Sequence, residues 1–164
     1  MTDRLITGLI FLSAIGSGLV AGTFFAFSTF VMTALARLPA AQGIAAMQSI
    51  NIVVINPLFM GAMFGTALAG LALGVAAITG WGEPRAVYLL GGGLLYLVGT
   101  VLVTMVFNVP RNDALAGLDP NGGEAASLWL RYVAEWTNWN NVRTVTALAS
   151  LAAFVLALRL PAAD

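Results

Sequence analysis

Residues 5–36, LITGLIFLSAIGSGLVAGTFFAFSTFVMTALA, form an uncharged and mostly apolar stretch near the start of the sequence. A helix needs about 20 apolar residues to cross a hydrocarbon core of about 30 Å, so this stretch is long enough for one crossing. Arg4 precedes it, as a basic residue precedes a secretory signal, but a signal-peptide core has only about 7–15 residues. We therefore predict a first membrane span within Leu5–Leu35.

Three further apolar segments meet the same length requirement. Asn56 and Pro57 are expected to begin the second, with Asn56 as the N-cap and Pro57 at the first helical position, where its missing N–H costs nothing. Pro110 is expected to stop the third. The sequence thus predicts an all-α fold, a transmembrane four-helix bundle that forms a single domain over 1–164. Its spans are expected at about residues 5–35, 57–79, 86–107 and 138–160.

The amino-acid composition also indicates a membrane protein. Apolar residues make up 60% of the sequence and charged residues 9%, whereas a soluble domain has roughly 45–50% and 25%. A soluble domain of this size buries only about 70% of the surface that its unfolded chain exposes, which is too little to hide so many apolar side chains. An integral membrane protein in contact with membrane lipids is therefore expected. Its expected location is the bacterial plasma (inner) membrane.

Charge and residue usage exclude several kinds of partner. Seven arginines balance seven acids, and no basic face or polybasic cluster is present, so nucleic acid is not expected to bind. Cysteine and histidine are both absent, which excludes disulfides, thiolate nucleophiles and histidine-based metal or haem sites. Because the acids are scattered and nearly all lie outside the apolar segments, neither a metal nor a cofactor is expected.

The distribution of arginines bears on orientation through the positive-inside rule. If Arg111 and Arg143 are counted as loop charges, their end of the bundle has more arginines and would be cytoplasmic. If they are site residues and are left out of the count, the end that carries the termini has more arginines and would be cytoplasmic. We expect the second case, with both termini in the cytoplasm. The two groups are Arg4, Arg85 and Arg159 at one end, and Arg37, Arg111, Arg131 and Arg143 at the other.

Two connections between spans carry residues at helical spacing. The first predicts a short helix that lies at the interface or is tucked under the bundle, and the third predicts an interfacial amphipathic helix. The first connection, residues 40–55, has this pattern at Ile44, Met47, Gln48, Asn51 and Ile55. The third connection, Glu124–Glu135, has it at Leu128, Trp129, Tyr132, Val133 and Trp136.

Small residues predict close helix packing. Three Gly-x-x-x-Gly pairs let helix backbones approach one another, within the bundle or in a homo-oligomer. The phenylalanines of the first span are attributed to core packing. The glycine pairs are Gly18 with Gly22, Gly61 with Gly65 and Gly70 with Gly74, and the phenylalanines are Phe24, Phe25, Phe27 and Phe30.

Polar and aromatic side chains gather at the start of the fourth span, in residues 136–144, WTNWNNVRT. In a helix, Trp136, Trp139, Asn140 and Arg143 would share one face. Two indoles could stack on a flat molecule while the amide and the guanidinium hold an oxyanion. The alternative is an interfacial aromatic belt with a snorkelling arginine, but a belt does not explain three asparagines in one turn.

A second polar group lies in residues 108–113, NVPRND, at the end of the third span. Helix capping accounts for Asn112 and Asp113, but it does not account for Asn108, which we expect to face Asn140 and Arg143. Two weaker candidates, one turn apart in the first connection, are Gln48 and Asn51.

These stretches together resemble a known family, the small four-span membrane proteins related to fungal anthrone oxygenases. The resemblance implies oxidation of a polycyclic anthrone, or a related quinone-like molecule, by O2 without a metal or flavin. The stretches that carry it occur in this order: Gly22–Ser28 (GTFFAFS), Met47–Asn51 (MQSIN), Asn56-Pro57, Asn108–Asp113 and Trp136-x-x-Trp-Asn-x-x-Arg143.

The resemblance also implies roles for individual residues. Arg143, Asn140 and Asn108 would be catalytic, with Arg143 and Asn140 holding the oxyanion that forms when a proton leaves the activated carbon. The substrate-binding residues would be Trp136, Trp139, Asn112, Gln48 and Asn51. Because histidine is absent, three proton acceptors stay open: Glu135, Asp113 or water.

A non-catalytic function is the competing hypothesis. The chain could be an accessory subunit of a larger membrane complex or a carrier of hydrophobic small molecules. In that case the asparagine and arginine side chains would satisfy one another's hydrogen bonds and leave no cavity between them.

Overall fold

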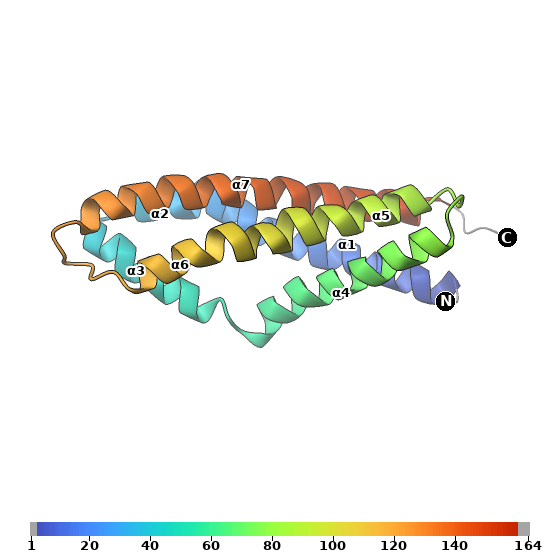
Figure 1. Ribbon diagram of the computed structural model, residues 1–164, viewed down its shortest axis with the longest axis horizontal. Coiled ribbons are helices and arrows are strands. Elements are labelled where there is room, and N and C mark those ends of the chain that lie inside the picture. The colour runs from blue at the N-terminus through green and yellow to red at the C-terminus, as the bar shows by residue number, and fades with distance from the viewer. Residues whose placement is uncertain (1–2, 161–164) are drawn as a thin grey trace.

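The structure, a computed structural model, describes residues 3–160. Four long helices lie alongside one another (Figure 1), and each is long and apolar enough to cross a membrane. Most of the described chain is helical and contains no β-strand, so the all-α prediction is confirmed. The four long helices are Asp3–Ala36, Pro57–Thr79, Ala86–Ala116 and Ala125–Leu158.

Several of these long helices consist of consecutive elements. The first comprises α1 (Asp3–Ala26), the π-helical turn η1 (Phe27–Val31) and α2 (Met32–Ala36). A short helix, α3 (Ala40–Val53), follows, and then the second long helix, α4 (Pro57–Thr79). The third comprises α5 (Ala86–Leu94), the π-helical η2 (Leu95–Leu102) and η3 (Thr104–Asn108), and α6 (Val109–Ala116). The fourth is α7 (Ala125–Leu158).

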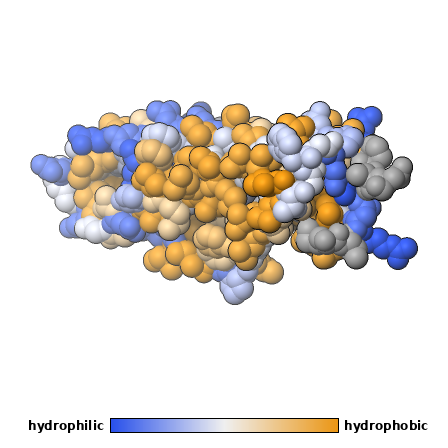
Figure 2. Space-filling view, turned by 45° about the vertical axis from the view of Figure 1, so that its right-hand side comes forward, coloured by the Kyte–Doolittle hydropathy of each residue, from blue (hydrophilic) through white to orange (hydrophobic). Residues whose placement is uncertain are grey.

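The surface shows an apolar belt between two polar ends. In Figure 2 the middle of the molecule is mostly orange and both ends carry blue residues. The arginines divide between the ends as three and three, because Arg143 lies between them in the interior of the bundle. Arg85 forms ion pairs with Asp3 and Glu83 at the end where α1 begins and α7 ends. The arginine count therefore favours neither orientation, and cytoplasmic termini stay a prediction.

The helices pack closely in one half of the bundle, called here the packed half (residues 3–22, 66–99 and 144–158). A Cβ atom on Gly93 would lie 2.7 Å from the Gly70 carbonyl oxygen, so α4 and α5 touch backbone to backbone there. Ser150 on α7 donates to the Gly92 carbonyl oxygen at 2.8 Å. Small residues thus bring the helices together, as the Gly70 pair predicted.

In the other half, called here the cavity half (residues 23–65 and 100–143), α4 diverges from the third long helix (Figure 1). The hydroxyl of Tyr96 donates to the Met63 carbonyl oxygen at 3.2 Å and holds α4 at that point. Beyond it, Gly61 and Gly65 have no neighbouring atom within 4 Å of an added Cβ, within the described chain. Their Gly-x-x-x-Gly pair therefore packs against nothing in residues 3–160.

The local signals at the start of α4 are confirmed. The Oδ1 atom of Asn56 accepts hydrogen bonds from the backbone N–H groups of Leu58 and Phe59 at 3.1 and 3.0 Å. Pro57 occupies the first turn. Since an N-cap satisfies donors that the helix leaves unpaired, Asn56 fixes where the diverging end of α4 begins.

Two predicted helix boundaries were wrong. The third span does not stop at Pro110 but continues to Ala116, because the wide π-helical turn of η3 precedes the proline and the chain resumes as α6. The segment Glu124–Glu135 is not a separate interfacial helix, since α7 runs unbroken from Ala125 to Leu158. Its amphipathic stripe packs inward instead, with Trp129, Tyr132 and Trp136 all buried. By contrast, the short helix predicted in the first connection is present as α3.

Candidate functional site

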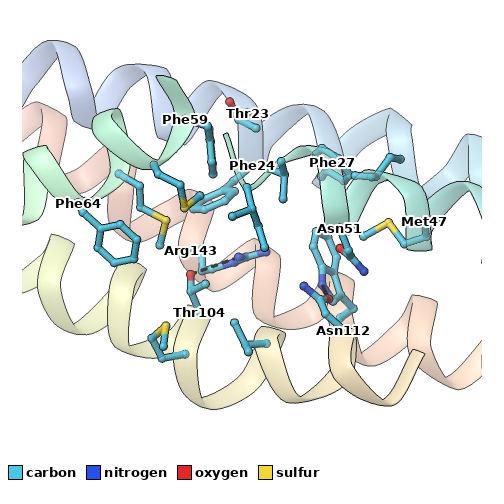
Figure 3. A pocket seen from close by; sticks show the side chains of 18 residues that line it. Thr23, Phe24, Phe27, Met47, Asn51, Phe59, Phe64, Thr104, Asn112 and Arg143 are labelled. Carbon is cyan, nitrogen blue, oxygen red and sulfur yellow. Dashed lines mark hydrogen bonds between the residues drawn. The ribbon is translucent and has the colours of Figure 1, made fainter. Parts of the chain in front are cut away.

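A cavity of about 220 Å³ lies in the cavity half, where α4 leaves the bundle (Figure 3). Ligand sites for drug-sized molecules have volumes of roughly 300–1,000 Å³, so this cavity suits a small ligand. Its walls are mainly apolar side chains with a few polar ones. The polar lining residues are Thr23, Asn51, Thr104, Asn112, Trp136 and Arg143, and the apolar ones include Phe24, Phe27, Met47, Phe59, Met63 and Phe64.

Arg143 is the only charged residue that lines this cavity in the described chain. Its side chain comes from the middle of α7 and is only 4% exposed. In Figure 3 its guanidinium points into the cavity between Phe24 and Thr104. The guanidinium carbon lies 4.1 Å from the centre of the Phe24 ring and 5.0 Å from that of Trp136. Such cation–π contacts contribute roughly 0.5–2 kcal/mol each.

The charge of Arg143 has no counter-ion among residues 3–160. The ion pairs of the described chain involve Arg85 and Arg111 instead. Arg143 donates from Nη2 to Asn140 Oδ1 at 2.7 Å and from Nη1 to Thr104 Oγ1 at 3.2 Å. Its Nε atom is buried without a hydrogen-bond partner in that range. A buried arginine with neutral partners retains the capacity to attract an anion.

Asn140 holds the guanidinium in place and is itself held by the first long helix. Its Nδ2 atom donates at 2.7 Å to both the Phe24 carbonyl oxygen and Ser28 Oγ. Because a carbonyl can only accept and a guanidinium can only donate, these contacts fix which atom of the amide is which. Asn140 is 0% exposed and does not line the cavity, so it positions Arg143 and does not face a ligand.

Asn112 is likewise oriented by its neighbours. Its Oδ1 atom accepts from Trp136 Nε1 at 2.8 Å and from the Tyr132 hydroxyl at 3.0 Å. The indole N–H can only donate, so the amide oxygen of Asn112 must face it and the NH2 group must point elsewhere. Capping does not explain Asn112, which lies inside α6; the residue joins α6 to α7 at the cavity wall.

Asn51 brings the short helix α3 into the site. Figure 3 shows Asn51 and Asn112 at one end of the cavity and Phe64 at the other. Asn51 lies beside the Tyr132 hydroxyl, but its Nδ2 atom is buried and finds no acceptor in the described chain. The two unpartnered buried polar atoms on cavity-lining side chains, Asn51 Nδ2 and Arg143 Nε, are both N–H donors. A ligand with oxygen acceptors would complement them.

Three other sequence-predicted site residues lie outside the cavity. The Trp139 ring stacks on Phe107, with centroids 3.5 Å apart and an interplanar angle of 7°. Asn108 is buried and donates to the Trp136 carbonyl oxygen at 3.2 Å. Gln48 donates to the carbonyl oxygens of Leu115 and Leu118 at 2.9 and 3.0 Å. These contacts give Trp139, Asn108 and Gln48 packing roles at the edge of the site.

Neither carboxylate considered as a proton acceptor reaches the cavity. Glu135 accepts from Arg111 Nε and Nη2 at 3.0 and 2.9 Å, and its side chain is 47% exposed. Asp113 is exposed on α6. Since no acidic residue lines the cavity in the described chain, the acids of this end belong to the surface.

The sequence interpretation missed the role of the first span in the site. Phe24 and Phe27 line the cavity, whereas Phe25 and Phe30 are 52% and 61% exposed on the outer surface. Core packing was therefore wrong for Phe25 and Phe30 and incomplete for the other two. Helical spacing alone could not have separated the two pairs, because Phe30 follows Phe27 at the same spacing of three that joins Phe27 to Phe24.

Comparison with known families now identifies the chain. A family model described as anthrone oxygenase matches residues 57–153, more than half of the 164 residues. The chain belongs to the anthrone oxygenase family. No significant match was found among curated proteins or among solved structures.

The part that matches the anthrone oxygenase family covers much of the site. It includes Thr104, Asn112, Trp136 and Arg143, which lie on η3, α6 and α7. Phe24 and Asn51 lie before the matched range. The cavity of this family member is thus built partly from the matched helices and partly from α1 and α3.

Proposed function

We propose that this anthrone oxygenase family member is a membrane-embedded, cofactor-independent oxygenase that acts on a hydrophobic aromatic molecule of the anthrone or quinone type. The observation that carries the proposal is Arg143, a buried cation without a counter-ion, directed into an apolar cavity. A charged side chain at the centre of a membrane helix costs roughly 2.5–3.5 kcal/mol and usually marks a functional site.

The chemistry needs a cation where negative charge develops. An anthrone loses a proton from the carbon opposite its carbonyl, and the charge moves to the carbonyl oxygen as an enolate. Arg143 would stabilise that oxygen in a cavity without bulk water, where electrostatic interactions are stronger. Asn140 keeps the guanidinium in place before the ligand arrives, so no reorganisation is needed during the reaction.

Dioxygen then completes the oxidation. The enolate transfers one electron to O2, and the resulting ligand radical and superoxide combine into a peroxide at the deprotonated carbon. Loss of the second hydrogen from that carbon and cleavage of the O–O bond give the second carbonyl. The carbon thus loses two hydrogens and gains one oxygen, and the other oxygen leaves as water. Because no acidic residue lines the cavity in the described chain, water is the proton acceptor in this scheme.

The remaining walls suit the ring system. Phe24, Phe27 and Trp136 offer aromatic faces, and Met47, Met60 and Met63 offer adaptable thioethers. Asn51 and Asn112 supply N–H donors at one end for further oxygen substituents. Together these groups bind a flat apolar molecule that carries oxygen atoms on its edge.

Oxygen consumption by the purified protein in lipid nanodiscs, supplied with an anthrone and a metal chelator, tests the proposal. We expect one O2 consumed for each quinone formed, at a rate well above that without protein. Arg143→Gln keeps a hydrogen-bonding side chain but removes the charge, and it should lower turnover by about 10²–10³-fold, as loss of an oxyanion-stabilising group does.

The matched control is Arg131→Gln, which removes an exposed arginine from the same helix and should leave turnover unchanged. Because anthrones also react slowly with O2 alone, every rate is compared with a protein-free sample. Wild-type protein that does not exceed this background, or Arg143→Gln that turns over at the wild-type rate, would remove the basis of the proposal.

A carrier of hydrophobic molecules is the second candidate function. The absence of an acidic residue from the cavity walls in residues 3–160 favours it, because binding needs no proton acceptor. Under this hypothesis the wild-type protein binds an anthraquinone but does not accelerate oxygen consumption. The non-catalytic hypothesis expects hydrogen bonds between asparagine and arginine side chains, and Arg143 and Asn140 form one. An accessory subunit that binds no ligand would leave no cavity beside them, whereas a cavity is present.

The orientation can be tested because the sequence contains no cysteine. We propose that the protein lies in the bacterial plasma membrane with both termini in the cytoplasm. Trp81 and Asn121 lie in exposed connections at opposite ends of the bundle. A membrane-impermeant maleimide applied to intact cells should then label Asn121→Cys and spare Trp81→Cys; the reverse pattern would contradict the proposed orientation.

A further inference from the structure

The cavity opens to the side of the bundle. Three of its lining residues are exposed, namely Ile55, Phe64 and Met105, with exposed fractions of 71%, 43% and 53%. They come from three segments: the α3–α4 connection, α4 and η3. We call the opening between these three side chains the mouth.

The mouth exists because α4 leaves the third long helix. α4 packs against α1, α5 and η2, and the Tyr96 hydroxyl fixes it at Met63. From there to Asn56 the helix diverges, and Gly61 and Gly65 face open space within the described chain. No side chain of residues 3–160 fills the gap, so the gap remains as a passage from the cavity to the outer surface.

The mouth lies at the depth of the hydrocarbon. Arg143 is eight residues from Glu135 and sixteen from Arg159 along α7, which places it about 12 Å and about 24 Å from these charges at 1.5 Å per residue. The surface around the mouth is apolar: Leu58, Leu68, Leu102 and Val106 are all at least half exposed. Lipid chains, not water, are the solvent for such a surface.

The end of the cavity towards the polar end of the molecule is closed. Helix α3 lies across it, with Ile44 and Met47 at 0% and 1% exposure. Gln48 fastens α3 by donating to the carbonyl oxygens of Leu115 and Leu118 at the end of α6. The Leu115 carbonyl also accepts from the Leu118 backbone N–H at 3.1 Å, so Gln48 adds a second donor to it. The two contacts from Gln48 hold α3 against the chain that leaves α6.

We infer that the aromatic ligand enters and leaves the cavity sideways, from the hydrocarbon of the bilayer, through the mouth between α4 and η3. This inference rests on the proposed ligand class but not on turnover. A molecule dissolved in the membrane reaches Arg143 without crossing water, and α3 bars the polar end. Met105 and Phe64 border the passage and control the rate of exchange.

Exchange of a coloured hydroxyanthraquinone with the protein in lipid nanodiscs tests the inference by stopped-flow absorbance. Met105→Trp narrows the mouth, and we expect association and dissociation to slow together by about tenfold, as when a gate limits passage. The Kd should change little, because a barrier slows entry and exit alike. Val106→Trp is the matched control: it adds the same ring to the neighbouring lipid-facing position and should leave both rates unchanged.

Phe64→Ala widens the mouth and should accelerate both rates, so the inference stays testable if Met105→Trp does not fold. Equal rates in wild type, Met105→Trp and Phe64→Ala would overturn lateral entry while leaving the ligand class intact. A wild-type protein that does not bind the quinone at all would overturn both the ligand class and the entry route.

Discussion

The packed half and the cavity half are built from the same four long helices but differ in what lies between them. In the packed half, glycines stand where helices meet, and the backbones of Gly70 and Gly93 touch. In the cavity half, the inward positions of α4 carry Phe59 and Met63, while Gly61 and Gly65 contact nothing within residues 3–160. Small residues therefore allow the helices to touch in the packed half, whereas the inward positions of α4 in the cavity half carry large side chains.

The two halves also differ in their buried polar groups. In the packed half, Ser17 and Ser150 form a hydrogen bond at 3.3 Å and Ser150 donates to a backbone carbonyl. Ser13 Oγ is also buried there, without a partner in the described chain. In the cavity half, the buried nitrogen atoms of Asn51 and Arg143 have no partner in residues 3–160, and both side chains line the cavity. Unpaired buried donors cost about 1–3 kcal/mol each. Asn51 and Arg143 thus lower stability at positions where a ligand could satisfy them.

The largest effect on stability is expected in the packed half. Gly93→Val would place side-chain atoms against the Gly70 backbone, which cannot move aside. Overpacking of this kind costs typically about 1–3 kcal/mol, and we expect the upper end here. Gly91→Val is the control, because no atom of the described chain lies within 4 Å of an added Cβ there. Thermal unfolding in detergent micelles measures both, and equal transitions would contradict the backbone contact.

Arg143→Met should make the cavity half more stable. Removing the buried charge recovers roughly 2.5–3.5 kcal/mol. Leaving Asn140 Oδ1 without its donor costs about 1 kcal/mol, and losing the two cation–π contacts costs at least about 0.5 kcal/mol each. We therefore expect the free energy of unfolding to rise by at most about 1.5 kcal/mol while turnover is lost. Arg131→Met, at an exposed position, should change stability by less than about 0.5 kcal/mol. A destabilised Arg143→Met would show that the arginine serves the fold.

Asn56→Ala should have a smaller effect at the start of α4. It removes the side-chain oxygen that accepts from Leu58 and Phe59, and loss of such an N-cap costs about 1 kcal/mol. Asn56→Asp retains an accepting oxygen and should keep most of the stability. If alanine and aspartate variants unfold at the same temperature, the cap does not determine where α4 begins.

The smallest change is expected for Gly61→Ala. Glycine in a helix interior is less stable than alanine by roughly 0.5–1 kcal/mol, and no described atom opposes a Cβ at this position. The variant should therefore be stabilised by about 0.5 kcal/mol. Gly16→Ala gives the contrast, since its Cβ would collide with the Thr66 side chain, and it should be destabilised. If both substitutions change the free energy of unfolding in the same direction, the two halves do not differ in helix packing as described.

Features governed by local rules were predictable from the sequence. Asn56-Pro57 fixed the start of α4 because capping depends on neighbouring residues alone. The α6 and α7 boundaries were not predictable in the same way. Pro110 and the polar residues at 137–141 suggest helix boundaries, but helix continues through both positions. Asn112 of α6 bonds to Tyr132 and Trp136 of α7 there, a contact between segments that local rules do not include. A π-helical turn before a proline leaves no trace in composition or periodicity.

The residues of the candidate site were likewise predictable only where local helix geometry determines their position. The spacing of Trp136, Asn140 and Arg143 correctly placed these residues in contact, because they lie within one narrow stripe of α7. Trp139 lies about 100° from Asn140 around the helix, so it turns towards Phe107 and away from the cavity. The contribution of α1 could not be anticipated, since Phe24 meets Arg143 only through the folded arrangement of helices distant in sequence.

The mouth between Ile55, Phe64 and Met105 also affects how a gas reaches the interior. Molecular oxygen is apolar and dissolves more readily in lipid chains than in water, so the bilayer is its reservoir. Under the proposed function, a cavity that opens towards the bilayer would draw both reactants from one phase and would keep water-soluble reductants away from the radical pair. The membrane would then supply the reactants as well as stabilise the fold.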